Sequence, residues 1–409
     1  MRRVVITGLG LNSPLGNSYD ELYESLKSGK SGIEYVPEWE DIKDLGTKVA
    51  GRVKNLDLKS IPRKYRRSMG RVAQLAAIST GDAISDANLT EDMLSSKRCG
   101  LAFGSTMGGN ETMFEYMPEV QAKMSFRGQN SMAFLKMMSH TVAANLAQMF
   151  GIKGRNLPTC SACTSSSQGI GAGYESVKYG MSDIMICGGS EEHHYLSAGV
   201  FDVMSAASTK HADQPHLSSK PFDESRDGLV VSEGSGAIVL EELEHALARG
   251  AKIYGEVIGY ATSCDGSHIT TPSKEGMLQV METSLEDANL KASDIEYINA
   301  HATATMRGDI AESHATYSLF GSKIPVSSTK GHMGHLLGGC GVVESIICLI
   351  ALNKSFLPKT MNFEKLDKEC ASINIIDKNI DKNVDIVMSN NFAFGGINTS
   401  LIFKKYDFL

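Results

Sequence analysis

The first residues that could do chemistry are two cysteines in the stretch 159-TCSACTSSSQGIGAG-173. Cys160 and Cys163 are spaced C-x-x-C, and small hydroxyl residues follow them into a glycine-spaced, helical segment. A thiol at the start of a helix lies at the positive end of the helix dipole, so we expect a lowered pKa and a nucleophilic Cys163. Two structural cysteines, a redox pair and half of a metal site are the alternatives, and this stretch alone leaves them open.

The sequence lacks the further residues that a redox pair or a metal site would need. A redox pair usually belongs to a small thioredoxin-like unit, and no such layout surrounds Cys160 and Cys163. A structural zinc site takes four ligands, commonly from a second C-x-x-C or a spaced histidine pair. His193 and His194 are adjacent in the sequence, which is a poor spacing for chelating one ion.

Two histidines near other strand ends favour the interpretation of Cys163 as a nucleophile. His301 lies in 299-NAHATATMRGD-309, and His335 follows Lys330 in 326-VSSTKGHMGHLLGGCGVVESI-346. A third loop, 389-SNNFAFGGINTSLIF-403, carries Phe394 before two glycines. Because α/β folds place catalytic groups on loops at strand ends, we expect Cys163, His301 and His335 to share one site.

The elements that must position these loops alternate along the chain. Helical patterns cover 66–87 and 165–180, and apolar, β-branched runs predict buried strands at 3–10, 99–106, 183–192, 236–243, 254–263, 295–303, 323–330 and 399–403. This alternation predicts an α/β fold with mostly parallel sheets covered on both faces. The first run, RVVITGLG, reads as a strand and a tight glycine turn, because Ser13 replaces the third glycine of a dinucleotide fingerprint.

A faint internal repeat indicates a duplicated architecture. GIGAGYESV (169–177) and GGCGVVESI (338–346) share small residues followed by Glu-Ser, and a division into 1–250 and 251–409 fits them. The methionine-rich segment 117–140 has two interpretations, which are adaptable core or dimer packing and a pocket for flexible acyl chains.

Composition excludes several classes of protein. The chain has 409 residues and a net charge of −7, which argues against a nucleic-acid surface. Eight scattered cysteines do not form a secreted disulfide framework, and neither a signal peptide nor an apolar run of about 20 residues stands out. We therefore expect a cytoplasmic enzyme with no membrane span.

Several ordered motifs together resemble the β-ketoacyl-[acyl-carrier-protein] synthases of the elongating type. They are VVITGLG, SACTS, CGGSEE, PFDESRDGLVVSEGSGAIVLEELEHALARGAKIYGEVIGY, NAHATAT, SSTKGHMGHLLGGCGVVESI and FAFGGIN, and they span essentially the whole chain. The resemblance implies a thiolase-like, five-layer α-β-α-β-α sandwich of two related halves and, usually, a homodimer. It implies an acyltransferase of fatty-acid or type II polyketide synthesis that needs neither a cofactor nor a metal.

The resemblance also assigns roles to residues. It implies that Cys163 accepts an acyl group from acyl carrier protein, and that His301 and His335 then assist the decarboxylation of malonyl-carrier protein and its condensation with the acyl group. Cys160 is then a buried bystander. The remaining implied residues are the supporting Lys330 and Glu344, the gating Phe394, the loop-fixing Asp309, the pantetheine-binding Thr303, Thr305 and Thr270, and Met107 in the acyl pocket. The implied oxyanion donors are the backbone N–H groups of Cys163 and Phe394.

Departures from the family pattern cluster near the expected substrate tunnel. The usual H-G-T-S-T-P is His301–Met306 with Ala302 and Ala304, the usual F-G-F-G-G-T-N contains Ala393 and Ile397, and His332 adds a third histidine. Ala393 would stiffen the gating loop if that position needed positive φ. Fatty-acid elongation therefore has an alternative, a specialised synthase that forms a heterodimer with a non-catalytic, chain-length-factor-like homologue. Arg66, Arg67 and Lys123 are candidates for steering the acidic carrier protein.

Overall fold

The computed structural model describes residues 1–407, and its largest element is a mixed sheet of eleven strands. In spatial order these are β12 (Asn374–Ile375), β10 (Pro325–Ser327), β9 (Tyr297–Asn299), β14 (Ile386–Phe392), β15 (Ile397–Lys404), β8 (Gly255–Cys264), β1 (Val4–Asn12), β7 (Gly234–Glu242), β6 (Ile184–Glu191), β4 (Cys99–Gly104) and β5 (Asn156–Thr159). Only three residue pairs join β1 to β8, so the sheet divides there into two parts.

The two parts of the sheet repeat one strand order. Read from the outside inwards, β5-β4-β6-β7-β1 on one side corresponds to β10-β9-β14-β15-β8 on the other, and β12 extends the second part. The two segments of the faint sequence repeat lie in α8 (Ser165–Lys178) and α14 (Cys340–Lys354), which pack against each other.

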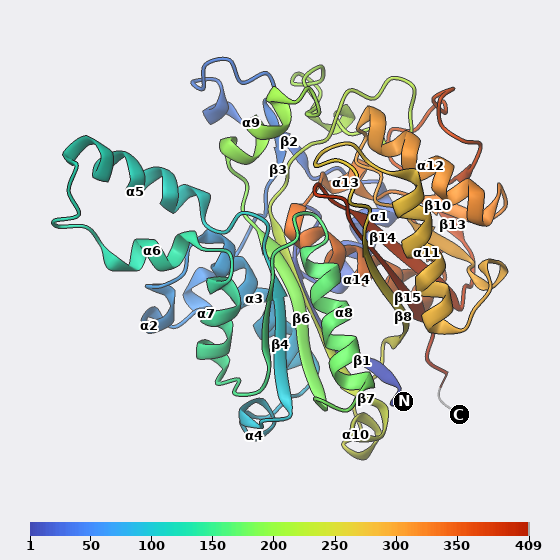
Figure 1. Ribbon diagram of the computed structural model, residues 1–409, viewed down its shortest axis with the longest axis horizontal. Helices are drawn as coiled ribbons and strands as arrows, with labels where there is room; N and C mark the ends of the chain where they lie inside the picture. The colour runs from blue at the N-terminus through green and yellow to red at the C-terminus, as the bar shows by residue number, and fades with distance from the viewer. Residues whose placement is uncertain (408–409) are drawn as a thin grey trace.

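Helices form three layers around these two parts, which makes five layers in all (Figure 1). The buried pair α8 and α14 lies between the parts of the sheet. One outer face carries α3 (Arg71–Asp86) and α7 (Thr141–Phe150), and the other carries α11 (Lys274–Ala288) and α12 (Met306–Phe320). This arrangement confirms the predicted thiolase-like sandwich.

The smaller elements connect these layers. The helices are α1 (Tyr19–Ser28), α2 (Arg63–Arg66), α4 (Glu91–Ser95), α5 (Asn110–Lys123), α6 (Ser131–Met137), α9 (Tyr195–Val203), α10 (Leu243–Ala248) and α13 (Lys330–Met333). Two small sheets pair β2 (Ile33–Tyr35) with β3 (Val49–Gly51) and β11 (Phe356–Leu357) with β13 (Ile380–Asp381). The predicted helix 66–87 is interrupted, because residues 67–70 separate α2 from α3.

The expectation of mostly parallel sheets is wrong. In the large sheet, five neighbouring strand pairs are parallel and five are antiparallel. A strand that is buried on both faces is a continuous apolar run whichever way its neighbours point, so the sequence pattern does not carry strand direction.

The tight turn expected at the first glycines is also wrong, because β1 continues through them to Asn12. A Cβ atom on Gly10 would lie 2.0 Å from the carbonyl oxygen of Ser79 in α3. The glycine is therefore needed for close packing of α3 on the strand rather than for a turn.

Helix α14 is an apolar helix of the interior. The stretch Leu337–Lys354 is long and apolar enough to cross a membrane, but 89% of it is buried inside the protein. Its position between the two parts of the sheet accounts for its composition, since every face of such a helix meets protein.

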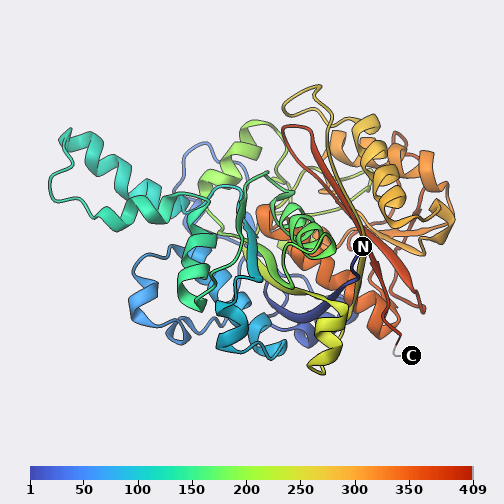
Figure 2. The same ribbon diagram turned by 60° about the horizontal axis from the view of Figure 1, so that its bottom comes forward.

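The methionine-rich segment forms a projecting arm. Figures 1 and 2 show α5 and α6 extending away from the body of the protein. Met117 is 51% exposed and Met124 is 87% exposed, so the interpretation as internal core is wrong. Apolar side chains on an arm of this kind are more typical of an interface.

Candidate active site

Cys163 lies in a tight turn between β5 and α8. Ala162 has a φ of +50°, a left-handed conformation that costs a residue with a Cβ about 1–2 kcal/mol. The turn brings Cys163 directly before Thr164, the N-cap of α8, and leaves it 7% exposed. Cys160 is exposed, with its Sγ 3.5 Å from the carbonyl oxygen of Thr106. The expectation of a buried Cys160 is therefore wrong, because the chain reverses between the two cysteines.

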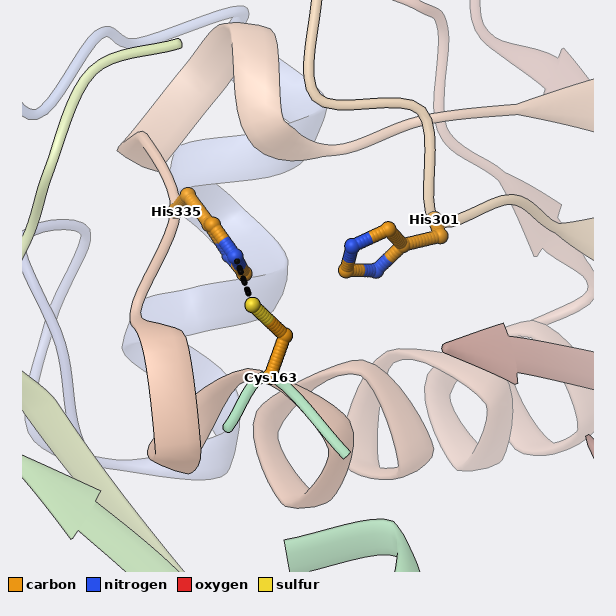
Figure 3. Close-up of side chains that lie close together, drawn as sticks. All are labelled: Cys163, His301 and His335. Carbon is orange, nitrogen blue, oxygen red and sulfur yellow. Dashed lines mark hydrogen bonds between the residues drawn. The ribbon is translucent and has the colours of Figure 1, made fainter. Parts of the chain in front are cut away.

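The thiol of Cys163 depends on a nearby base rather than on a low pKa. Burial raises the pKa of Cys163 to about 12, and the Lys330 cation only partly opposes this. Desolvation of the thiolate thus outweighs the helix dipole, which reverses the direction expected from the sequence. The Nε2 atom of His335 lies 2.9 Å from Sγ of Cys163 and is close enough to exchange a proton with it (Figure 3).

A buried carboxyl group holds the His301 loop in place. Glu312 of α12 accepts the backbone N–H of His301 at 2.8 Å and that of Ala302 at 2.6 Å. Burial raises the pKa of Glu312 to about 8, and Asp309 adds to this effect. The sequence analysis missed Glu312, although an acidic side chain three residues after Asp309 on a helix that follows the histidine loop was an available signal.

The two histidines face the thiol from different loops. Figure 3 shows the rings of His301 and His335 on either side of Cys163. Their centroids are 5.2 Å apart and their planes are nearly perpendicular, at 85°. Burial, reinforced by the Lys330 cation, holds the pKa of both imidazoles well below its ordinary value. Both rings are therefore neutral near pH 7, and each has one N–H donor and one lone pair.

Behind the histidines lies a buried ion pair. The Nζ atom of Lys330 bonds Oε1 of Glu344, and the two side chains are 1% and 0% exposed. Burial raises the pKa of Glu344 above its ordinary value, although Lys330 opposes the effect. Burial also disfavours the Lys330 ammonium, but the carboxylate of Glu344 outweighs it and raises the pKa of Lys330.

A cavity of about 440 Å³ reaches this site from the surface. Seven residues expected in the site line it, namely Cys163, Thr270, His301, Thr303, Thr305, His335 and Phe394. The hydroxyls of Thr303 and Thr305 are 3.1 Å apart, and the ring of Phe394 lies 5.6 Å from that of Phe201. The structure therefore brings a nucleophile, two imidazoles and a polar, aromatic passage together.

Other expected residues lie outside the lining of this cavity. The backbone N–H of Met107 contacts Glu191, and its sulfur is 3.3 Å from Oγ of Ser197. Asp309 accepts the backbone N–H of Phe222 at 2.7 Å, and burial raises its pKa to about 6. The candidates for steering the carrier protein, Arg66, Arg67 and Lys123, are also absent from the lining. Among the described residues, the arginine that lines the cavity is Arg307.

The departures from the family pattern have local explanations. Ala393 is not among the described residues with positive φ, so the expected cost of replacing glycine there does not arise. Ala304 has a φ of +67° and does carry such a cost. The ring nitrogens of His332 each lie 3.2 Å from a backbone carbonyl oxygen, those of Lys30 and Lys359, so this histidine fastens loops outside the cavity.

The same side chains could also hold a metal ion. One potential ligand atom from each of Cys163, His301 and His335 lies within 4.8 Å of the others. A thiolate and two imidazoles are a donor set that zinc accepts.

Comparison with known proteins places this geometry in a family. Residues 1–246 match the family model of the N-terminal domain of β-ketoacyl synthases, and residues 254–364 match that of the C-terminal domain. The chain is 41% identical to 3-oxoacyl-[acyl-carrier-protein] synthase 1 of Haemophilus influenzae over 100% of both chains. It is 39% identical to the synthase 1 of Escherichia coli over 99% of both.

Solved structures agree with the sequence relatives. A β-ketoacyl synthase from Burkholderia phymatum superposes with a TM-score of 0.96 and 41% identity over 100% of both chains. The ishigamide ketosynthase/chain length factor superposes with a TM-score of 0.92 and 29% identity, over 99% of this chain and 100% of that one. The chain therefore belongs to the β-ketoacyl synthase family, among its elongating 3-oxoacyl-[acyl-carrier-protein] synthases, which are acyltransferases.

Proposed function

We propose that this enzyme joins an acyl group held on Cys163 to malonyl-carrier protein, with loss of CO2, and releases a β-ketoacyl-carrier protein two carbons longer. The observation that carries the proposal is the convergence of Cys163, His301 and His335 at the inner end of one cavity. The names of the relatives support a carrier protein as the partner.

Acylation is the first step. The thiol of Cys163 attacks the thioester of an acyl-carrier protein, gives up its proton, and becomes an acyl thioester while the carrier leaves as a thiol. His335 is the proton acceptor within reach, 2.9 Å from the sulfur. The backbone N–H groups of Cys163 and Phe394 are the proposed donors to the tetrahedral oxyanion.

Condensation is the second step. Malonyl-carrier protein occupies the emptied cavity, and N–H groups of His301 and His335 donate to its thioester oxygen. As CO2 leaves, these donors stabilise the enolate, whose carbon attacks the acyl thioester on Cys163. The C–S bond breaks, and the sulfur takes up one proton to restore the thiol.

Residues around the triad have supporting roles in this proposal. Thr303, Thr305 and Thr270 bind the phosphopantetheine arm, because these hydroxyl-bearing residues line the cavity. Phe394 gates the passage, and Gly395 and Gly396 with φ of +87° and +70° give the gating loop its turn. Asp309 fixes the His301 loop, Met107 belongs to the acyl pocket, and Lys330 and Glu344 support the histidines.

We propose a homodimer that works in the cytoplasm. Strand β5 is at an edge of the sheet and is only half-buried, so two copies could pair their edges. The exposed apolar residues of the α5–α6 arm fit the same assembly. All eight cysteines are free, as expected in a reducing compartment. The division into halves 1–250 and 251–409 stays part of this proposal and is supported by the repeated strand order.

The second candidate is a catalytic or acyl-binding subunit of a heterodimer. The likeness to the ishigamide ketosynthase/chain length factor favours it, but its 29% identity is below the 41% shared with the synthase 1 of Haemophilus influenzae. Fatty-acid elongation by a homodimer is therefore the function that we put first.

Turnover by the purified chain alone tests both candidates. The enzyme is mixed with acyl-carrier protein and then malonyl-carrier protein, and protein and product are followed by intact mass. An acyl adduct on Cys163 and a β-ketoacyl product support the homodimer. An adduct without product at several chain lengths favours a missing partner subunit. Full condensation by Cys163→Ala would overturn the proposed function.

A further inference from the structure

Asn391 lies at the centre of the polar groups behind His301. It is on β14, it is 1% exposed, and its side chain contacts residues of α8, α14 and the His301 loop. The Nδ2 atom lies 2.6 Å from Oε2 of Glu344, 3.3 Å from Nδ1 of His301 and 3.6 Å from Sγ of Cys340. The Oδ1 atom accepts the hydroxyl of Ser167 at 2.6 Å.

Glu344 decides which way the amide of Asn391 points. A carboxylate has no proton to give and can only accept, so the atom 2.6 Å from it must be the NH2 group. The opposite orientation would press the amide oxygen against the carboxylate and aim the NH2 group at Ser167. The ion pair with Lys330 favours the charged form of Glu344 against the effect of burial, and this supports the orientation.

The orientation of the amide then decides the tautomer of His301. One N–H of Asn391 points to Glu344, and the second is left for Nδ1 of His301. Nδ1 is therefore an acceptor without a proton, and a neutral imidazole must then carry its proton on Nε2. Nε2 is the nitrogen available to the Cys163 side of the ring.

His335 lacks such a partner. Its Nδ1 atom is buried without a hydrogen-bond partner among residues 1–407. Nothing described around that atom selects one tautomer, so His335 can accept the thiol proton in one step and donate in the next. His301 is the histidine that is held as a donor throughout.

We infer that Asn391 is a positioning residue that keeps His301 as an Nε2–H donor. The enzyme needs this donor in the decarboxylation step and not in acyl transfer. The inference rests on the proposed function, in which the enolate oxygen needs that donor. Acyl transfer to Cys163 needs the base His335 and the thiol, and neither contacts Asn391 in the structure.

The amide of Asn391 is tightly packed between α8 and α14. A Cβ atom on Gly341 of α14 would lie 2.8 Å from Oδ1 of Asn391 and 2.3 Å from Oγ of Ser167. The helices α8 and α14 therefore close on the amide and hold it in the orientation that Glu344 selects.

The test separates the two half-reactions in Asn391→Leu, a variant of similar size without donor or acceptor. Acylation is measured as the rate of adduct formation on Cys163, and decarboxylation as CO2 released when malonyl-carrier protein meets the acylated enzyme. We expect acylation at the wild-type rate and CO2 release slower by about 10- to 100-fold, as when a partner that orients a functional histidine is removed. Equal losses in both half-reactions, or no loss, would overturn the inference.

Two further variants keep the test sharp. Asn390→Leu is the matched control, because Asn390 is also buried on β14 but contacts Met281 on the opposite face. It should leave the ratio of the two rates unchanged, and an equal loss of CO2 release in this variant would count against Asn391.

Asn391→Asp adds a readout that a structural role would not move. The new carboxyl group would place an oxygen where the NH2 group of Asn391 lies, so Glu344 would have to take up a proton and donate it to that oxygen. The same oxygen would accept a hydrogen bond from Nδ1 of His301 and so hold a proton there. The neutral ring would then present a lone pair at Nε2, while the imidazolium would still donate. The other titratable groups around this ring are Cys163, Lys330, His335, Cys340 and Glu344. CO2 release by this variant should therefore fall as pH rises through the pKa of His301, and wild type should show no such fall. The same profile in both would refute the tautomer argument. If wild type releases no CO2, the proposed function itself fails.

Discussion

Replacing Lys330 by methionine would leave Glu344 as a buried charge without its counterion. Methionine keeps most of the apolar stem of lysine but removes the ammonium. The two side chains are 1% and 0% exposed, so water cannot take over the role of the ammonium. Asn391 would remain as the donor to Glu344, at 2.6 Å. Breaking a buried pair on one side typically costs about 3–5 kcal/mol.

The pKa of Glu344 sets an upper limit on this loss. The buried carboxyl group of Glu344 can take up a proton instead of staying charged. The ordinary pKa of a glutamate carboxyl group is 4.5. Protonation at pH 7.5 costs at most about 4 kcal/mol relative to the unfolded chain, at about 1.36 kcal/mol per pH unit. At pH 5.5 the limit falls to about 1.4 kcal/mol. Since the folded-state pKa is raised, the penalty is absent below the unfolded pKa and grows as pH rises towards the folded one.

Urea unfolding of wild type and Lys330→Met at fixed protein concentration measures this difference. We expect a loss of about 3–4 kcal/mol at pH 7.5 and of about 1–1.5 kcal/mol at pH 5.5. The double variant with Glu344→Gln should recover most of the stability at pH 7.5, because no charge is left unpaired. A loss in Lys330→Met that is the same at both pH values would refute the reasoning.

Three further predictions concern single groups in or near the site. Alkylation of Cys163 by iodoacetamide should accelerate from pH 6 to pH 10 without a plateau near neutrality, since burial raises its pKa to about 12; a plateau below pH 8 would contradict this. The free energy of unfolding should fall more steeply in wild type than in Glu312→Gln as pH rises from about 5 to 8. In this range folded Glu312, with a pKa of about 8, holds a proton that the unfolded chain has lost. Parallel curves for the two proteins would contradict this prediction. Gly341→Ala should destabilise the protein by about 1–3 kcal/mol in urea, because its Cβ would lie 2.3 Å from Oγ of Ser167, whereas Gly199→Ala, whose Cβ would meet nothing closer than 3.8 Å, should change stability little.

Several features of this protein follow from the sequence by itself. Apolar periodicity and turn residues act locally, so the alternation of strands and helices and the loops carrying Cys163, His301 and His335 are visible in the residues. Ordered motifs along the whole chain resemble one family, and the comparisons with known proteins confirm that family. The faint repeat at 169–177 and 338–346 also predicts that the chain is built from related parts.

Other features are decided only by tertiary structure. A strand that is buried on both faces is a continuous apolar run in either direction, so the sequence does not predict which neighbouring strands are antiparallel. The direction of the pKa shift of Cys163 depends on how much water the fold removes, and here burial outweighs the helix dipole. Asn391 carries no distinctive sequence signal, and the position of Glu312 three residues after Asp309 does not show which groups it contacts. Both residues matter because α12 brings the carboxyl group of Glu312 to the backbone of His301, and β14 brings the amide of Asn391 to its ring. Such contacts between distant segments exist only once the layers have packed.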